Sequence, residues 1–351
     1  MLYFHNDYHD CCHNAVLEKL NSIFGEAYPG YGTDQCCARA AGMIRQLCGR
    51  EDAAVHFLVG GTQTNLTVIA AALRPHQGVI GAETAHINVH ETGAIEATGH
   101  KIIGISSTDG KLTAQQVEET VRQQRQSDDA EHIAQPKMVY ISNSTEVGTV
   151  YTLAELEALS GVCKKWGLYL FLDGARLGYA LASRESDVTV ADIARLCDVF
   201  YIGGTKMGAM FGEAVVILNP AIAEDFRYLI KQKGGMLAKG WLLGAQFEAL
   251  LENGLYFDIA RHANLLADQI RMTLEELGWP ERLGGGSNQI FPILPDALLE
   301  ELGRSYTFSE MGRVDAHHRM VRFCTGWAST QQDVDDLCRD LRAVSAKIKN
   351  S

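Results

Sequence analysis

The feature of this sequence that most constrains its fold is a repeated alternation of short apolar runs with longer segments of helical periodicity. A strand buried on both faces of a sheet reads as a continuous apolar run, and strands that alternate with helices are typical of α/β proteins. The pattern therefore predicts an α/β fold with a mostly parallel mixed sheet sandwiched by helices. The expected strands are 55–59, 78–80, 102–105, 138–141, 168–172, 199–202 and 215–218, and the expected helices between them are 63–73, 113–126, 153–166 and 190–197.

The pattern changes near residue 240, where a long helical run over 241–277 begins. A chain of 351 residues is long enough for two unequal domains. We therefore expect a large domain over 1–245, which includes an N-terminal arm, and a smaller α+β domain over 246–351. The elements expected after the long helix are a loop at 284–287, a strand at 289–294, a helix at 297–302, a strand at 320–325 and a final helix from Gln331.

Charge and composition restrict the partners of this chain. It has 31 Lys and Arg residues against 43 Asp and Glu residues, a formal charge of −12. An acidic surface argues against nucleic acid or a membrane surface as partner, although a local basic pocket for a small anion remains compatible with it. No run approaches the roughly 18 apolar residues of a membrane span. The first residues lack the basic and apolar regions of a signal peptide, so we expect a cytoplasmic protein. Nine cysteines without a Cys-x-x-Cys spacing predict reduced thiols.

Four chemically distinctive segments follow predicted strands at their carboxyl ends, the edge at which open α/β sheets bind ligands. In the first, a strand leads into Gly60-Gly61-Thr62 and then into a helix. Glycines allow close approach of the backbone, and a helix N-terminus supplies free N–H groups and partial positive charge, which suits a phosphate. An ordinary strand-to-helix turn is the alternative. The segment is not a P-loop, because no Gly-Lys-Ser/Thr follows.

Two further segments place a single charged residue after an apolar run. Asp173 ends one run, and a buried carboxylate needs a cation or strong donors, for which Arg176 is one candidate. Lys206 follows a later run in a Gly-rich turn. A Lys buried among hydrophobic residues has a lowered pKa and can form a Schiff base with a carbonyl compound. The alternative is a surface Lys whose ammonium group extends to solvent.

The fourth segment contains His86 and His90, four residues apart. Two His at this spacing could share a helix face and bind a metal ion, but a third ligand at matching spacing is missing. We therefore expect no metal site. His86 lies at the same predicted sheet edge as the other three segments, which favours a role in a ligand site. The alternative is a structural His in a loop.

One cofactor, pyridoxal 5'-phosphate, suits all four segments: the Gly60-Gly61-Thr62 turn, which we call the phosphate cradle, and the residues Asp173, Lys206 and His86. Lys206 would hold the aldehyde as an imine, and Asp173 would keep the ring nitrogen protonated so that the ring can accept electrons. His86 would supply a flat partner for the ring. Asp173 and Lys206 lie about 30 residues apart, which is the length of one crossover between parallel strands.

The sequence resembles the threonine aldolase and β-eliminating lyase group of fold-type I pyridoxal-phosphate enzymes. The matching motifs occur in the order of that group and extend over most of 6–322. They are Gly60-Gly61-Thr62-Gln63-Thr64-Asn65, Ala85-His86-Ile87, Asp173-Gly174-Ala175-Arg176-Leu177, Thr205-Lys206 and Lys233-Gly234-Gly235-Met236.

The resemblance implies a role for each matching residue. Lys206 would carry the covalently bound cofactor, Asp173 would pair with the pyridinium nitrogen and His86 would stack on the ring. Arginine pairs bidentately with carboxylates, which suits Arg176 and Arg322 for the carboxylate of an amino acid substrate. The remaining cofactor contacts are implied for Gly61, Thr62, Arg176 and Thr205, and a substrate contact for Asn6, which stands where the group usually has Ser.

Two departures from the group concern catalysis and assembly. Thr145 stands near the place of a His that could deprotonate the substrate hydroxyl, which leaves His86 as the expected base, with His90 or Glu91 as alternatives. Leu237 replaces an Arg, for which Lys233 or Lys239 could compensate. The resemblance also implies a homodimer or homotetramer with active sites shared between subunits, in which Tyr31 and a basic residue near Gly234 cross the interface.

The expected activity is that of a lyase: retro-aldol cleavage of a β-hydroxy-α-amino acid, of the threonine or allo-threonine type, to glycine and an aldehyde. Two alternatives keep the cofactor and change the reaction, namely β-elimination and transamination. A non-enzymatic binding protein is a third alternative. Retention of Lys206, Asp173 and Arg322 argues against it, because a pure binder needs no imine-forming Lys beside an electron sink.

Overall fold

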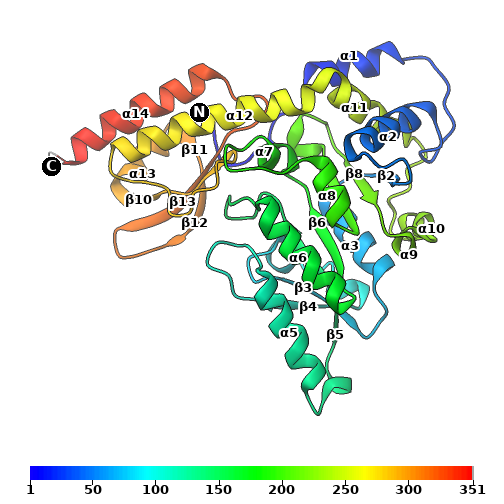
Figure 1. The fold of residues 1–351 in the computed structure, drawn as a ribbon. Helices are drawn as coiled ribbons and strands as arrows, with labels where there is room; N and C mark the ends of the chain where they lie inside the picture. Colours follow the sequence, from blue (N-terminus) through cyan, green and yellow to red (C-terminus); the bar gives the residue numbers. More distant parts are fainter. Residues whose placement is uncertain (350–351) are drawn as a thin grey trace.

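The central sheet has seven strands in the order β2-β8-β7-β6-β5-β3-β4 (Figure 1). The computed structural model describes residues 1–349. β8 runs antiparallel to β2 and β7, and the other neighbouring pairs are parallel, so the carboxyl ends of all strands except β8 meet at one edge. The strands are β2 (Ala54–Leu58), β3 (Gln77–Ala82), β4 (Lys101–Ile105), β5 (Gln135–Ser142), β6 (Tyr169–Asp173), β7 (Val199–Gly203) and β8 (Glu213–Ile217).

Continuous burial along the inner strands accounts for the apolar runs in the sequence. Every residue of β3, β7 and β8 is buried, because helices cover the sheet and leave no solvated face for alternate polar residues. The predicted α/β class with a mostly parallel mixed sheet is therefore confirmed. All nine cysteines are unpaired, as expected from their spacing.

Helices α5, α6 and α8 pack side by side across the sheet, and α3 packs against β6, β7 and β8 (Figure 1). Within residues 1–349, no helix has both the length and the apolar character needed to cross a membrane. The α-helices within the first 251 residues are α1 (Asn14–Ser22), α2 (Gln35–Cys48), α3 (Gly61–Ala72), α4 (His86–Val89), α5 (Ala114–Gln126), α6 (Leu153–Trp166), α7 (Leu177–Leu181), α8 (Val190–Leu196), α9 (Pro220–Ala223), α10 (Phe226–Gln232) and α11 (Trp241–Leu251).

A second, smaller core lies at the left of Figure 1, where β13 pairs with β9, β10 and β12 in antiparallel fashion under α12, α13 and α14. The first strand of the chain also belongs here, because β1 pairs with β11 and Phe4 packs in this core. The elements are β1 (Leu2–Tyr3), α12 (Leu255–Glu276), β9 (Gln289–Ile290), β10 (Ile293–Pro295), α13 (Asp296–Leu302), β11 (Tyr306–Thr307), β12 (Ser309–Arg313), β13 (His318–Cys324) and α14 (Gln331–Lys349).

Helix α12 joins the two cores. Its first half, including Ile259 and Ala263, packs in the large core, and its second half, including Leu266 and Ile270, packs in the small one. The predicted boundary at 245/246 falls inside α11, whereas the division between the two cores falls inside α12.

The expected single helix over 241–277 is two helices, and this expectation was wrong. α11 ends at Leu251 and α12 begins at Leu255. Between them Asn253 and Gly254 have positive φ values of 54° and 75°, a left-handed conformation that interrupts a right-handed helix. The expected strand at 289–294 is likewise divided into β9 and β10.

Helix α11 approaches α2 closely at Gly244. A Cβ atom placed on Gly244 would lie 2.4 Å from the backbone nitrogen of Cys37 and 2.5 Å from its Cα. Backbone atoms cannot move aside as a flexible side chain can, so only glycine permits this helix contact.

We expect Gly244→Ala to lower the free energy of unfolding by about 1–3 kcal/mol, because it overpacks a contact between two backbones. Gly161→Ala is the matched control, since Gly161 lies in α6 and a Cβ atom added to it would have nothing within 4 Å. That change should raise stability by about 0.5–1 kcal/mol through helix propensity. Thermal and urea unfolding of both variants measure the difference. Equal stability of the two variants would contradict the packing argument.

Candidate active site

The Gly60–Thr62 segment forms the start of helix α3 at the carboxyl end of β2. Gly60 is the N-cap, and no side chain caps the helix, so the first N–H groups of α3 are available to a ligand. The segment lines a cavity of about 220 Å³ together with Asp173 and Lys206. A Cβ atom on Gly61 would lie 3.1 Å from the hydroxyl of Tyr201, so glycine keeps this wall of the cavity open.

Asp173 ends β6 and is 5% exposed. Tyr140 Oη donates to Asp173 Oδ2 over 2.5 Å, Asn65 Nδ2 donates to the same oxygen over 3.1 Å, and the Ala175 N–H donates to Oδ1 over 3.0 Å. Burial, and after it the charge of Asp173, raises the pKa of Tyr140 well above its usual value, so Tyr140 remains a donor. Oδ1 accepts from the Ala175 N–H, and a carboxylate oxygen can accept from more than one donor, so a ligand N–H in the cavity can also bond to it.

Arg176 does not pair with Asp173, so that alternative was wrong. It pairs with Asp7 instead: Arg176 Nε donates to Asp7 Oδ2 over 2.7 Å and Arg176 Nη2 donates to Oδ1 over 2.9 Å. Asn288 Nδ2 also donates to Asp7 Oδ2, over 2.9 Å. Burial alone would raise the pKa of Asp7, but Arg176 and Lys206 bring it down to about 2. The pair ties the N-terminal arm to the turn after β6.

Lys206 lies in a short 3-10 turn, Thr205–Met207, directly after β7. Tyr179 Oη donates to the main-chain oxygen of Lys206 over 2.7 Å, which holds the turn. Burial, and after it the charge of Arg176, lowers the pKa of Lys206 despite the opposing effects of Asp7 and Asp173. A lowered pKa increases the fraction of free amine, the nucleophilic form.

His86 begins α4 and is oriented by a buried carboxylate. Its Nδ1 lies 2.8 Å from Glu91 Oε1, and the Glu91 side chain is fully buried. Asn65 Nδ2 donates to the same Glu91 oxygen over 2.7 Å, so Asn65 connects Glu91 with Asp173. Glu146 Oε1 accepts from the His86 backbone N–H over 3.0 Å.

A larger cavity of about 630 Å³ adjoins the first. The two cavities share His86, Glu146, Arg176 and Lys206 as lining residues. Arg322 on β13 lines the larger cavity, and its Nη atoms contact Gln289, Ser309 and the main-chain oxygen of His5. Its Nε is buried without a partner. An unpartnered guanidinium nitrogen beside a cavity is suited to an anionic group of a ligand.

The other predicted residues lie in different places. His90 lines the larger cavity, and burial followed by the charges of His86 and Arg322 lowers its pKa. Asn6 is buried, and its Oδ1 accepts from the Tyr8 N–H, but it lines neither cavity. Within the described residues 1–349, no three His, Cys, Asp or Glu side chains are grouped to hold a metal ion.

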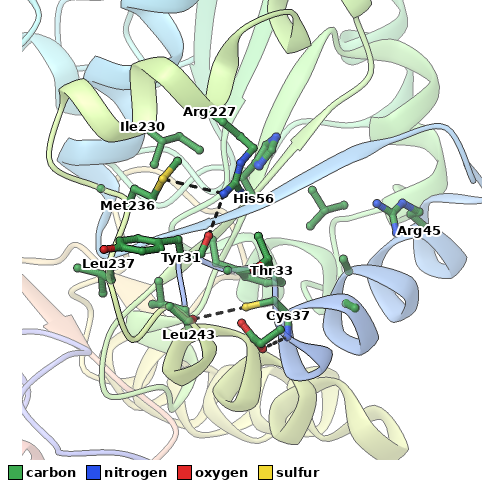
Figure 2. Close-up of a pocket in the computed structure, with 18 residues that line it drawn as sticks. Tyr31, Thr33, Cys37, Arg45, His56, Arg227, Ile230, Met236, Leu237 and Leu243 are labelled. Atoms are coloured by element: carbon green, nitrogen blue, oxygen red, sulfur yellow. Dashed lines mark hydrogen bonds between the residues drawn. The ribbon is translucent and has the colours of Figure 1, made fainter. Parts of the chain in front are cut away.

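Tyr31 lies in a separate cavity of about 290 Å³ that shares no lining residue with the two cavities at Lys206 (Figure 2). Arg227 Nη2 donates to the Tyr31 main-chain oxygen over 3.0 Å. Met236 and Leu237 line the same cavity, as Figure 2 shows. Tyr31 therefore does not reach the Lys206 site of its own chain.

Sequence reasoning missed several residues of the site. Asp7, Asn65 and Tyr140 act through contacts between segments far apart in the chain, which no local pattern reveals. Glu213 lines the smaller cavity and had a readable signal, because it is a single acid directly before an apolar run, just as Asp173 is a single acid directly after one.

The residues present fit pyridoxal 5'-phosphate. The uncapped start of α3 suits the phosphate, the open lone pair of Asp173 suits a ring N–H, and Lys206 lies in the same cavity with a lowered pKa. Arg322, which hydrogen-bonds to neutral oxygens and lines the adjoining cavity, suits a substrate carboxylate there.

We expect Asp7→Asn to cost about 3–5 kcal/mol of stability at neutral pH, because it leaves Arg176 buried without its counter-charge. The folded pKa of Asp7, about 2, is below the ordinary value of 3.8, so the stabilising charge is present above about pH 4 and is lost as the pH falls toward 2. The stability difference between wild type and variant should therefore shrink over that range in urea unfolding. Asp52→Asn, which breaks an exposed pair with Arg50, is the control and should change little. A difference that stays constant from pH 6 to pH 2 would contradict the role of Asp7.

Comparison with known proteins agrees with this site. The sequence model of the family described as β-eliminating lyase matches residues 17–288. Low-specificity L-threonine aldolases from Pseudomonas sp. (strain NCIMB 10558) and Pseudomonas aeruginosa are 34% and 33% identical to this chain, over 94% and 95% of it and 93% and 96% of their own lengths. A solved structure of Leishmania major threonine aldolase is 45% identical, with a TM-score of 0.96 over 98% of this chain and 100% of that one. The resemblance identified from sequence is confirmed: the chain belongs to the β-eliminating lyase family and has the fold of fold-type I pyridoxal-phosphate enzymes.

Proposed function

We propose that this protein is a pyridoxal-phosphate-dependent lyase that cleaves a β-hydroxy-α-amino acid of the threonine type to glycine and an aldehyde. The observation that carries the proposal is that Lys206 and Asp173 line one cavity with the uncapped start of α3, while Arg322 lines the adjoining one. The full-length similarity to threonine aldolases supports it. When bound, the cofactor supplies an electron sink for the bond that breaks.

Lys206 would hold the cofactor covalently through its amine, and Asp173 would accept a hydrogen bond from the ring nitrogen and keep it protonated. Tyr140, Asn65 and the Ala175 N–H stabilise the Asp173 charge for this purpose. Gly61 and Thr62 would hold the phosphate through the free N–H groups of α3.

His86 is the residue suited to remove the proton of the substrate β-hydroxyl. Glu91 accepts a hydrogen bond from Nδ1 of His86, which leaves Nε2 as the proton acceptor in the neutral imidazole. This assignment follows the logic by which a buried carboxylate fixes the tautomer of a catalytic His. The same ring would stack on the cofactor.

The two arginines have unequal roles toward the substrate carboxylate. Arg176 already uses Nε and Nη2 on Asp7, so only Nη1 is left for a ligand. Arg322 donates its hydrogen bonds to the neutral oxygens of Gln289, His5 and Ser309, so its charge is left for the substrate. Arg322 would therefore be the main carboxylate ligand and Arg176 a supporting one.

We further propose a homo-oligomer in which Tyr31 completes the site of a neighbouring subunit. This arrangement is supported by the location of Tyr31 in a cavity that shares no lining residue with the two cavities at Lys206 of its own chain. The cytoplasmic location expected from the N-terminal residues also stays a prediction.

Two measurements test the function. The pure protein mixed with pyridoxal 5'-phosphate should gain a visible absorption band, and borohydride should fix the cofactor to Lys206 in a peptide identified by mass spectrometry. Lys206→Ala should lose both signals, whereas Lys137→Ala, a Lys that contacts the Gly167 main-chain oxygen far from the site, should keep them. Threonine should then yield glycine and an aldehyde. Release of ammonia and a keto acid would identify β-elimination instead, and conversion of the cofactor to its amino form with a keto acid would identify transamination.

Arg322→Gln should raise the KM for the amino acid by about 10- to 100-fold, because a charge-assisted hydrogen bond contributes about 1.5–3 kcal/mol. Arg319→Gln is the matched control on the same strand, since Arg319 pairs with Asp296 and Glu310 away from the cavity. Steady-state kinetics of both variants measure the effect. An unchanged KM in Arg322→Gln would remove Arg322 from the substrate site.

A further inference from the structure

Glu213 is a buried carboxyl group at the phosphate end of the cofactor cavity. As the first residue of β8 it pairs with Leu58 at the end of β2 and with Gly203 at the end of β7. These two strand ends lead directly into the Gly60–Thr62 cradle and into the turn that carries Lys206. Glu213 is 4% exposed and lines the same cavity as the cradle. Nothing in the proposed reaction uses it, and a carboxylate there would repel a phosphate.

The contacts of Glu213 connect it to Thr205, which was expected to bind the phosphate. Thr205 Oγ1 lies 2.9 Å from Glu213 Oε1, and the Gly204 N–H donates to Glu213 Oε2 over 3.1 Å. The Gly212 N–H donates to Thr205 Oγ1 over 3.0 Å. The Thr205 hydroxyl therefore has two protein neighbours before any ligand is considered.

The donor count of one hydroxyl then decides what Thr205 can do. A hydroxyl has one proton to donate and two lone pairs to accept with. If Glu213 is ionised, Thr205 must donate its proton to Oε1 and has none left for a phosphate. If Glu213 is protonated, its O–H donates to Thr205 Oγ1, the Gly212 N–H fills the other lone pair, and the Thr205 proton is free to point into the cavity.

We propose that Glu213 carries a proton whenever the cofactor phosphate is bound, and that this proton makes Thr205 a donor to the phosphate instead of a donor to Glu213. The inference rests on the proposed function, because it takes pyridoxal 5'-phosphate as the ligand. Glu213 is in this sense a positioning residue, which acts on the phosphate through Thr205.

The electrostatic surroundings favour the protonated form. Burial raises the pKa of Glu213 to about 8, against the lowering effects of the Thr205 hydrogen bond and of Lys206. The titratable groups that act on Glu213 are Lys206 in the adjoining turn, Asp173 on β6, Tyr201 on β7 and Tyr256 on α12. Burial raises the pKa of both tyrosines, so they stay neutral, and Asp173 favours the proton on Glu213.

The sign of the pH dependence follows from these directions. A bound phosphate dianion raises the pKa of Glu213 further, so binding the phosphate and binding the proton favour each other. Below about pH 8 the proton is already present in the free protein. Above that pH each complex must take up a proton, and affinity for a phosphate-bearing ligand falls by about tenfold per pH unit.

The experiment compares pyridoxal 5'-phosphate with pyridoxal, which has the same aldehyde and ring but no phosphate. Dissociation constants of both are measured from the absorption change between pH 7 and pH 9.5. Titration of Lys206 affects the binding of both ligands, so the ratio of the two dissociation constants reports on the phosphate alone. In the wild type, the preference for the phosphorylated ligand should be constant up to about pH 8 and then fall by about tenfold per pH unit.

Two variants test the assignment to Glu213. In Glu213→Gln, the amide keeps the shape and can donate to Thr205 at every pH, so the preference should become independent of pH. Glu146→Gln is the matched control, since Glu146 is another buried carboxyl group that lines the same cavity. It accepts hydrogen bonds from the Ser142 hydroxyl and the His86 N–H rather than from Thr205. It should keep the wild-type pH dependence.

A further measurement needs no variant. Calorimetry of the wild type at pH 8.5, in buffers of different ionisation enthalpy, should show more proton uptake with the phosphorylated ligand than with pyridoxal. The inference would be overturned if the wild-type preference for the phosphorylated ligand did not change with pH. It would also be overturned if Glu213→Gln kept the wild-type pH dependence of this preference, or if both ligands caused equal proton uptake. Failure of the phosphorylated ligand to give any absorption change would instead refute the proposed function.

Discussion

A negative charge kept inside the protein organises this structure. An unpaired buried carboxylate costs several kcal/mol, and Asp173 lies at the end of a strand that is otherwise apolar. Its cost is offset by three donors that come from β5, from α3 and from the turn after β6. The donors converge only if β5 and β6 pair in the observed register, with Ser142 opposite Asp173. The hydrogen bonding of Asp173 therefore depends on the register of the sheet and on the placement of α3.

The need to pair a buried charge also connects the N-terminal arm, the large core and the small core. Asp7 in the N-terminal arm pairs with Arg176 of the large core and accepts a hydrogen bond from Asn288, which lies just before β9 of the small core. Lys206 and Arg322 come from different cores but line one cavity. Helix α12 packs in both cores and so connects the part of the chain that carries Lys206 with the part that carries Arg322. A single buried charge network thus spans the arm, the sheet edge and the small core.

Local sequence patterns predicted most of the fold because they report local physics. The apolar runs identified all seven central strands to within a few residues, since burial on both faces leaves no polar positions in them. The prediction of one long helix over 241–277 was wrong because the backbone conformation of two residues interrupts it, and the pattern of apolar residues does not reveal that conformation. Asn253 and Gly254 adopt positive φ values that end one helix and start another with little change in the hydrophobic periodicity. The predicted pairing of Asp173 with Arg176 was wrong for a different reason: Arg176 is near Asp173 in sequence, but it pairs instead with Asp7 of the N-terminal arm.

The sequence by itself determined the class of fold and predicted the edge of the sheet at which Lys206, Asp173 and His86 lie, because strand burial, Gly-rich turns and isolated charges are properties of adjacent residues. Only the tertiary structure decided which polar groups meet. It paired Arg176 with Asp7, gave Asp173 its neutral donors, fixed His86 through Glu91 and placed Glu213 against Thr205. Hydrogen bonds act over about 3 Å, and residues far apart in the chain come within that distance only after the sheet and its helices have packed.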